Sequence, residues 1–89
     1  MPRLEYSQRF VNDFAAIETK KLEQHILKNL DNIELFAEFG SPDIPASIKE
    51  EFDGDIRKVA VSPFDLIYTY FADRDLCRIE ALVHQKAAR

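Results

Sequence analysis

Residues 56–89 read IRKVAVSPFDLIYTYFADRDLCRIEALVHQKAAR, and this stretch decides the fold. Apolar and polar residues alternate along it, in segments separated by turn signals at 62–64 and 72–75. Alternation with a period of two is typical of strands that bury one face. The stretch therefore predicts three consecutive antiparallel strands, which are Ile56 to Val61, Leu66 to Phe71, and a last strand through Cys77 to His84 that ends in a basic tip, His84 to Arg89.

The residues before this stretch predict one more strand and two helices. Arg3 to Tyr6 alternates like a short strand, and the Ser7 hydroxyl can cap a helix by accepting an amide of its first turn. The apolar stripe of the first helix is Phe10, Phe14 and Ile17, and that of the second is Leu22, Ile26, Leu30, Ile33 and Ala37. The order β-α-α-β-β-β predicts an α+β fold, with a helical hairpin packed on one face of a small, mostly antiparallel sheet.

The segment between the second helix and the sheet is predicted to be mostly irregular. Gly40 suits a helix C-cap, and the two prolines within 40–45 predict a loop. Ile48 to Phe52 predicts a turn of helix, and 53–55 a turn before the sheet. The carboxylates of this region are interpreted as a solvated loop, with no spacing that suggests a metal site.

Length and composition indicate one domain, residues 1–89, with a single small core. No apolar run is long enough to span a membrane, and no secretory signal is recognisable. Cys77 is the only cysteine, so we expect no internal disulfide and a reducing, cytoplasmic compartment. The net charge of −4 means that nucleic acid could bind only where cations cluster. The acidic surplus either aids solubility or faces a basic protein partner.

His84 is the most suggestive candidate for chemistry. It follows an apolar strand and precedes Lys86 and Arg89. A histidine beside cations can act as a general acid or base, while the cations hold a phosphate or a developing negative charge. The alternative is a polar strand end with no catalytic role. We see no glycine-rich phosphate loop, dinucleotide turn or zinc motif, and expect no cofactor and no metal.

Alternation assigns the candidate side chains to the two faces of the sheet. In the last strand, Cys77, Ile79, Ala81 and Val83 are predicted to meet the helices, and Arg78, Glu80, Leu82 and His84 to face outward. Lys58 would then share the outward face with His84. Arg57 would point toward the helices, where it would need a carboxylate partner such as Asp13 or Glu18.

Several motifs, in this order, resemble the RelE/ParE superfamily of toxins from bacterial type II toxin–antitoxin modules. They are the opening LEYS at 4–7, the GDIR at 54–57, the FDLIY at 64–68, and the apolar strand followed by His84 and a basic tip. The resemblance covers nearly the whole chain. It implies a small cytoplasmic toxin, of the kind that stabilises plasmids by inhibiting growth, neutralised by an antitoxin that wraps it.

The resemblance also implies two classes of target. RelE-like members cleave mRNA at the ribosome, and ParE-like members poison DNA gyrase. Asp65 stands where RelE-like enzymes typically have arginine, and the chain ends at Arg89 without a later catalytic tyrosine. These departures favour a ParE-like toxin that targets gyrase or another protein. The alternatives are a ribosome-dependent mRNA endoribonuclease, and a degenerate member that binds its antitoxin without being toxic.

The candidate site residues follow from these alternatives. Lys58, His84, Lys86 and Arg89 would be catalytic if the chain is an endoribonuclease. The same four residues, together with Arg57, would otherwise bind the target or the antitoxin. Whether the chain is a monomer or a homodimer stays open, and we expect no membrane partner.

Overall fold

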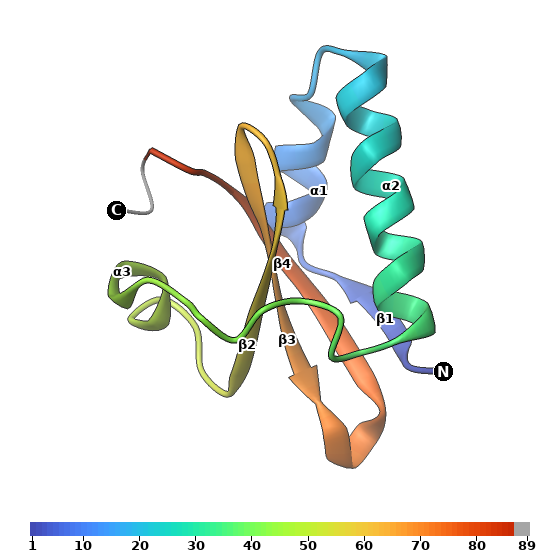
Figure 1. The fold of residues 1–89 in the computed structure, drawn as a ribbon, viewed down its shortest axis with the longest axis vertical. Helices are drawn as coiled ribbons and strands as arrows, with labels where there is room; N and C mark the ends of the chain where they lie inside the picture. The colour runs from blue at the N-terminus through green and yellow to red at the C-terminus, as the bar shows by residue number, and fades with distance from the viewer. Residues whose placement is uncertain (87–89) are drawn as a thin grey trace.

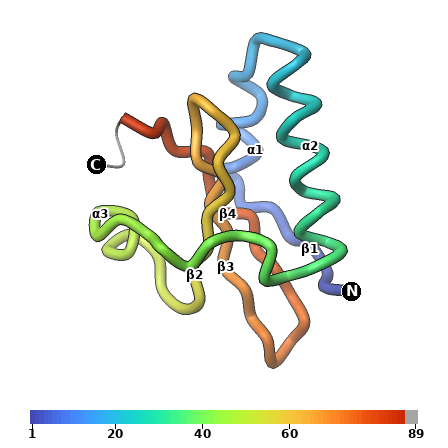
Figure 2. Tube along the Cα trace, in the orientation of Figure 1, coloured from blue at the N-terminus to red at the C-terminus, as the bar shows by residue number. Residues whose placement is uncertain are grey.

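The computed structural model describes residues 1–86, which form a four-stranded sheet with helices on both faces (Figures 1 and 2). The strands are β1 (Arg3–Tyr6), β2 (Asp55–Val61), β3 (Phe64–Phe71) and β4 (Leu76–His84), and the helices are α1 (Gln8–Ala15), α2 (Lys20–Leu35) and α3 (Ala46–Lys49). The sheet order is β1-β4-β3-β2, and only the β1–β4 pair is parallel. The predicted α+β fold with a mostly antiparallel sheet is therefore confirmed.

Ser7 joins the first strand to the first helix. Its Oγ accepts a hydrogen bond from the amide of Phe10 at 3.0 Å, which caps α1 as the sequence predicts. The same hydroxyl donates to the carbonyl of Glu80 at 2.6 Å, and the Ser7 amide donates to the carbonyl of Ile79 at 3.0 Å. One residue thus starts the helix and fixes that helix against β4.

The main core lies between the α1–α2 pair and one face of the sheet (Figure 1). Its buried helical members are Phe10, Ile26, Leu30 and Ile33, and its buried strand members are Val61, Leu66, Tyr68, Cys77, Ile79 and Leu82. The apolar stripes read from the sequence therefore do meet the sheet. The aromatic side chains of Tyr68 and Tyr70 belong to this core, as expected of a central strand.

A second core covers part of the opposite face. Ile44 and Ile48, from the loop after α2 and from α3, pack on Ile56 and Ile67 of the sheet, with Phe52 and Val83 at the margin. The expectation that the helical hairpin covers one face and leaves the other bare is therefore wrong in part. The physical reason is that Ile56 and Ile67 point away from α1 and α2, and their apolar surface requires its own cover.

A β-bulge in β4 changes which side chains face the helices. Tyr68 pairs with Ile79 and Ile67 with Ala81, so Glu80 is an extra residue without a partner on β3. One inserted residue reverses every later assignment, because side chains alternate with a period of two. Leu82 is consequently buried in the main core and Val83 contacts the second core, contrary to the prediction.

Tyr68 and Arg57 fix the chain where α2 leads into the sheet. The Tyr68 hydroxyl donates to the carbonyl of Ala37 and accepts from the amide of Gly40, both at 2.7 Å. The Arg57 guanidinium donates to the carbonyl of Gly40 at 3.0 Å and lies 3.3 Å from Asp55 Oδ1 and 3.8 Å from Glu38 Oε2. Neither of the partners expected for Arg57 is used, because its strand lies at the sheet edge beside the end of α2.

Asp13, one of those expected partners, has a different role. Its Oδ2 accepts a hydrogen bond from the amide of Leu82 at 3.0 Å. β1 pairs with β4 only as far as Ile79, so the carboxylate of α1 serves the strand beyond the point where β1 ends. The contact holds the bulged half of β4 against α1.

Candidate functional site

His84 ends β4 on the same side of the sheet as α1 and α2. It pairs with Phe64, a member of the main core's margin, and its ring stands edge-on to that ring with the centroids 5.6 Å apart. Its Nδ1 accepts a hydrogen bond from the amide of Lys86 at 3.2 Å. An imidazole whose Nδ1 accepts carries its proton on Nε2 when neutral, so Nε2 is the atom that can donate a proton.

Lys58 lies on the other face. It pairs with Ile67, whose side chain belongs to the second core. The amide and carbonyl of Lys58 bond to the carbonyl and amide of Ser41, at 3.0 and 2.9 Å, so its backbone is fixed even though β2 is an edge strand. The prediction that Lys58 and His84 share a face is therefore wrong, and the bulge at Glu80 is the cause.

Near the end of β4, Asp65 and Gln85 lie on the same face of the sheet as Lys58. Asp65 pairs with Ala60 and Val83, is 6% exposed, and accepts a hydrogen bond from Gln85 Nε2 at 3.3 Å. The Gln85 amide donates to the carbonyl of Pro63 at 2.9 Å, so the chain after β4 turns back over the β2–β3 turn. Gln85 thus lies on the face where strict alternation of side chains along β4 predicted His84.

The remaining predicted site residues differ in availability. Lys86 is exposed directly after this turn, whereas Arg57 has a side chain only 13% exposed and is held by intramolecular partners. Arg89 lies outside the described residues. Of the predicted cations among the described residues, Lys58 and Lys86 are therefore the ones that an anionic ligand could reach. Gln85 Nε2 has a second hydrogen beyond the one that bonds Asp65.

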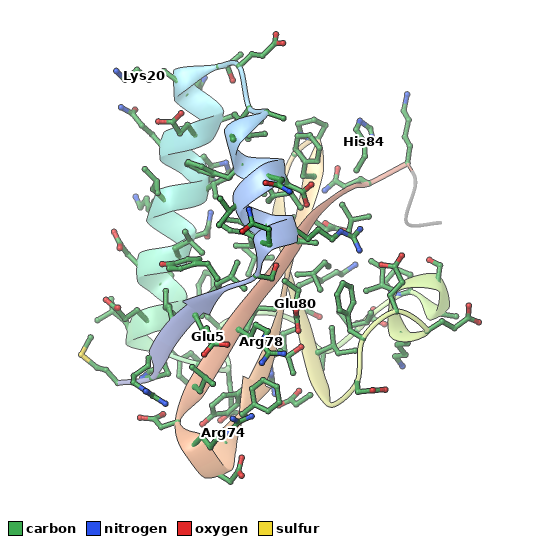
Figure 3. All side chains as sticks on the ribbon, turned by 180° about the vertical axis from the view of Figure 1, so that it is seen from behind. Glu5, Lys20, Arg74, Arg78, Glu80 and His84 are labelled. Atoms are coloured by element: carbon green, nitrogen blue, oxygen red, sulfur yellow. The ribbon has the colours of Figure 1, made fainter. Side chains whose placement is uncertain are left out.

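A second polar cluster lies on the same face near the β3–β4 turn, and sequence reasoning gave it no role (Figure 3). The Arg74 guanidinium lies 4.6 Å and that of Arg78 5.5 Å from the centroid of the Phe71 ring. Arg78 Nε is 3.3 Å from Glu5 Oε1. The signal that could have revealed the cluster is the alternation of charged residues in β4.

The carboxylates of this cluster limit its chemistry. Glu80 Oε2 accepts a hydrogen bond from Thr69 Oγ1 at 2.8 Å, and Glu5 neutralises Arg78. Guanidinium groups over an aromatic ring can stack on a planar ligand. A polyanion would nevertheless meet two glutamates on the same surface, so the cluster is poorly suited to hold a phosphate.

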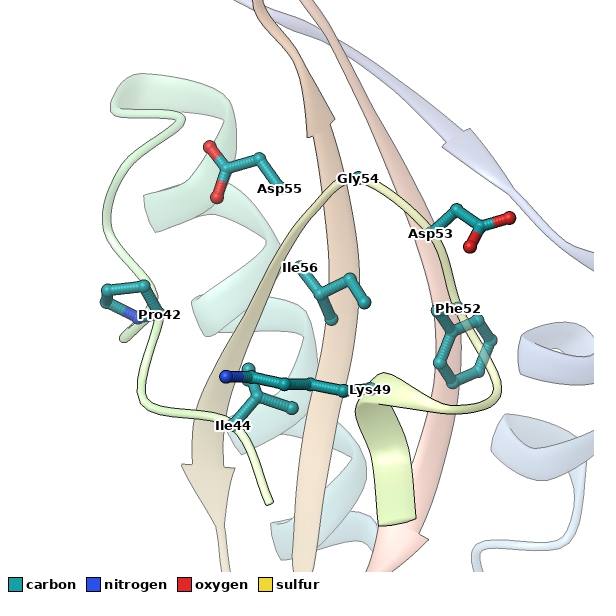
Figure 4. A pocket seen from close by; sticks show the side chains of 8 residues that line it. All are labelled: Pro42, Ile44, Lys49, Phe52, Asp53, Gly54, Asp55 and Ile56. Carbon is teal, nitrogen blue, oxygen red and sulfur yellow. The ribbon is translucent and has the colours of Figure 1, made fainter. Parts of the chain in front are cut away.

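A cavity of about 370 Å³ opens beside α3 (Figure 4). Its lining residues are Pro42, Ile44, Lys49, Phe52, Asp53, Gly54, Asp55 and Ile56. One amine and two carboxylates surround an apolar floor made by the second core. The cavity belongs to the acidic segment that the sequence marked as a solvated loop.

Metal, thiol and membrane sites each have requirements that concern the titratable side chains and the helices of residues 1–86. No three His, Cys, Asp or Glu side chains of that range gather as a metal site requires. Cys77 is buried, and burial raises the pKa of its thiol to about 11, so little of the reactive thiolate forms near neutral pH. None of the helices described is long and apolar enough to cross a bilayer.

No protein-family model matches the sequence, and no curated protein matches it. Solved structures do match. The intact RelBE toxin–antitoxin complex of E. coli gives a TM-score of 0.74 at 10% identity, covering 94% of this chain and 96% of that one. The RelE–RelB complex of Pyrococcus horikoshii gives 0.67 at 15%, covering 94% of each chain. A YafQ mutant from E. coli gives 0.58 at 23%, covering 98% of this chain and 97% of that one. The chain therefore has the fold of these structures.

Proposed function

We propose that this chain is the toxin of a type II toxin–antitoxin module and acts, as RelE-like toxins do, on mRNA at the ribosome. The observation that carries the proposal is the fold match to RelE in two toxin–antitoxin complexes, over more than nine-tenths of both chains. Three of the matching structures are of RelE or YafQ, and they favour this alternative over the gyrase-directed, ParE-like function that the sequence suggested. A cognate antitoxin, the cytoplasm and arrested growth belong to the same proposal.

The residues proposed to contact RNA come from β2 and from the segment after β4. Lys58 faces away from α1 and α2, and the turn over Asp65 brings Gln85 to the same face, with Lys86 exposed beside it. The two lysines can balance charge on a scissile phosphate, and the second hydrogen of Gln85 Nε2, whose first bonds Asp65, can donate to a phosphate oxygen. His84, with its proton on Nε2, is the proposed proton donor, and Arg89 would extend the basic tip.

A second candidate is a member that binds its antitoxin without cleaving RNA. One observation favours it: Asp65 is buried and hydrogen-bonded at the position where the resemblance implies an arginine. A carboxylate repels a phosphate rather than stabilising it. Because Gln85 already engages this carboxylate, Asp65 has a structural use that does not depend on catalysis.

The experiment is in vitro translation on bacterial ribosomes, followed by primer extension to detect cuts in the mRNA. We expect cuts with the wild-type chain, and at least a tenfold loss in the double variant Lys58→Ala, Lys86→Ala, because two charge contacts to the phosphate are removed. The matched control is Lys21→Ala, Lys28→Ala, which removes two exposed lysines of α2 and should cut as the wild type does.

The other outcomes separate the alternatives. Intact mRNA together with inhibited supercoiling by gyrase would overturn the proposal in favour of a ParE-like toxin. Intact mRNA, active gyrase and normal growth of cells that express the chain would leave the antitoxin-binding, non-toxic member.

A further inference from the structure

The outward side of α2 exposes apolar side chains that neither core uses. Leu27 and Leu35 are 45% and 68% exposed, and they are two helical turns apart on one side of the helix, with Asp31 between them. Phe36 and Phe39 extend this surface past the helix end, at 58% and 42% exposure. Contiguous exposed apolar surface of this kind marks a site of association.

Tyr6 of β1 borders the same surface. Its side chain is 48% exposed and stacks on Phe10. Burial of part of the ring, followed by the nearby carboxylates of Glu34 and Asp31, raises the pKa of the Tyr6 hydroxyl. We call the α2 patch the surface formed by Tyr6, Leu27, Asp31, Glu34, Leu35, Phe36, Glu38 and Phe39.

The charge of the α2 patch is negative. Three of its members are exposed carboxylates, and the last turn of α2 contains no basic residue to offset the negative end of the helix dipole. Arg57 reaches Glu38, but its side chain is 13% exposed and shared with Asp55, so it neutralises little of the surface. Lys28 lies one helical turn before Asp31, and among the described residues it forms no ion pair with it.

This charge decides between two occupants. A second copy of the chain would bring the same carboxylates together, and like charges at an interface oppose association. A basic amphipathic segment would pair its cations with Asp31 and Glu34 while its apolar side chains cover Leu35 and Phe36. The net charge of −4 on the whole chain favours the same kind of partner.

We propose that the α2 patch binds a basic amphipathic segment of a partner protein. The chemistry of the α2 patch carries this inference, because it follows from the exposed leucines, phenylalanines and carboxylates themselves.

The test uses the full chain and a fluorescein-labelled helical peptide of leucine and lysine, with its leucines on one face. Binding is measured by fluorescence anisotropy. We expect the double variant Asp31→Lys, Glu34→Lys to weaken binding by about tenfold or more, because attraction becomes repulsion. The control Glu50→Lys, Asp53→Lys changes the net charge equally on the α3 side and should change binding less than about threefold.

A second variant tests the apolar part of the α2 patch. Leu35→Ala, Phe36→Ala removes exposed side chains, so the fold should survive and its circular dichroism should stay unchanged, while the peptide binds about fivefold or more weakly. Equal weakening by both charge-reversal variants, or equal binding of a scrambled peptide, would overturn the inference. So would sedimentation showing a dimer that Leu35→Lys dissociates, because a second copy would then occupy the patch.

These results are separable from the proposed function. The Asp31→Lys, Glu34→Lys variant should still cut mRNA at the wild-type rate, because its substitutions lie away from Lys58 and Lys86. Loss of peptide binding with cutting retained supports the α2 patch as a partner site. If the peptide binds this variant as tightly as the wild type, the inference is wrong, even where mRNA cleavage is observed.

Discussion

Replacing Tyr68 by phenylalanine tests the junction that positions Lys58. The Tyr68 side chain is fully buried, and its hydroxyl joins the carbonyl of Ala37 to the amide of Gly40 through two hydrogen bonds of 2.7 Å. Tyr68→Phe leaves both backbone groups without this partner in a buried position. An unsatisfied buried group costs about 1–3 kcal/mol, so the loss of both partners should lower the free energy of unfolding by about 2–6 kcal/mol.

Urea denaturation followed by circular dichroism measures this loss. For an m-value of about 1.5 kcal/mol/M, a loss of 3 kcal/mol lowers the midpoint by about 2 M. Tyr70→Phe is the matched control, because Tyr70 lies on the same strand, is only partly buried, and has no hydroxyl hydrogen bond among residues 1–86. Its midpoint should move by less than about 0.5 M.

The same variant should affect the edge of the sheet. Gly40 precedes Ser41, whose backbone forms both hydrogen bonds with Lys58. Hydrogen exchange at the amides of Ser41 and Lys58 should therefore become faster in Tyr68→Phe than in Tyr70→Phe. A loss below about 0.5 kcal/mol, with unchanged exchange at these two amides, would refute the claim that the hydroxyl organises this junction.

Three further predictions concern Gly40, the buried hydroxyl and thiol groups, and the bulged register of β4. A Cβ on Gly40 would lie 2.7 Å from a ring carbon of Tyr68 and 3.0 Å from the Lys58 carbonyl oxygen, so Gly40→Ala should destabilise the fold by about 1–3 kcal/mol in urea denaturation. Burial raises the pKa of Tyr68 to about 12 and of Cys77 to about 11, from 10.0 and 9.0. The folded state keeps these protons longer, so stability is complete below about pH 9 and falls as the pH rises toward 12, which thermal melts would detect as a lower melting temperature. Leu82→Ala should cost about 2–4 kcal/mol, whereas His84→Ala should cost less than about 0.5 kcal/mol, and equal losses in urea would contradict the bulged register.

The elements and the main core could be predicted because each depends on local patterning. Ser7 caps α1 through a short-range contact, and the stripes through Phe10 and Ile26 carry a helical period that only one face of the sheet can bury. The β3 segment is similarly unambiguous, because its aromatic and β-branched residues suit a central strand. These inferences needed no knowledge of distant contacts.

The second core could not be predicted in the same way. Ile44 lies in a loop with two prolines and Ile48 in a helix of four residues, so neither shows a period that a pattern can reveal. Their burial depends on Ile56 and Ile67, which face away from α1 and α2. Only the three-dimensional arrangement indicates that this short segment closes over the opposite face.

The bulge at Glu80 decides which candidate site residues share a face of the sheet, and the contacts around it come from several elements of the fold. Glu80 receives hydrogen bonds from Ser7 at its carbonyl and from Thr69 at its carboxylate, and Asp13 holds the amide of Leu82 beyond it. No pattern within β4 distinguishes a bulged strand from a regular one, so strict alternation predicted His84 on the same face as Lys58. The extra residue instead brings Gln85 to the Lys58 face and leaves His84 against Phe64.

This exchange changes the chemistry available beside Lys58. An amide donates hydrogen bonds but does not transfer protons near neutral pH, so Gln85 does not replace His84 as a general acid on the face that carries Lys58. Cleavage with His84 as the acid would require substrate to pass around the end of β4, where His84 can donate from Nε2. Binding alone would require only the Lys58 face. An assay that measures RNA binding and RNA cleavage separately, on His84→Ala, distinguishes these two cases: a variant that binds but does not cut places the proton donor at the strand end, and a wild-type chain that binds without cutting assigns the fold to recognition alone.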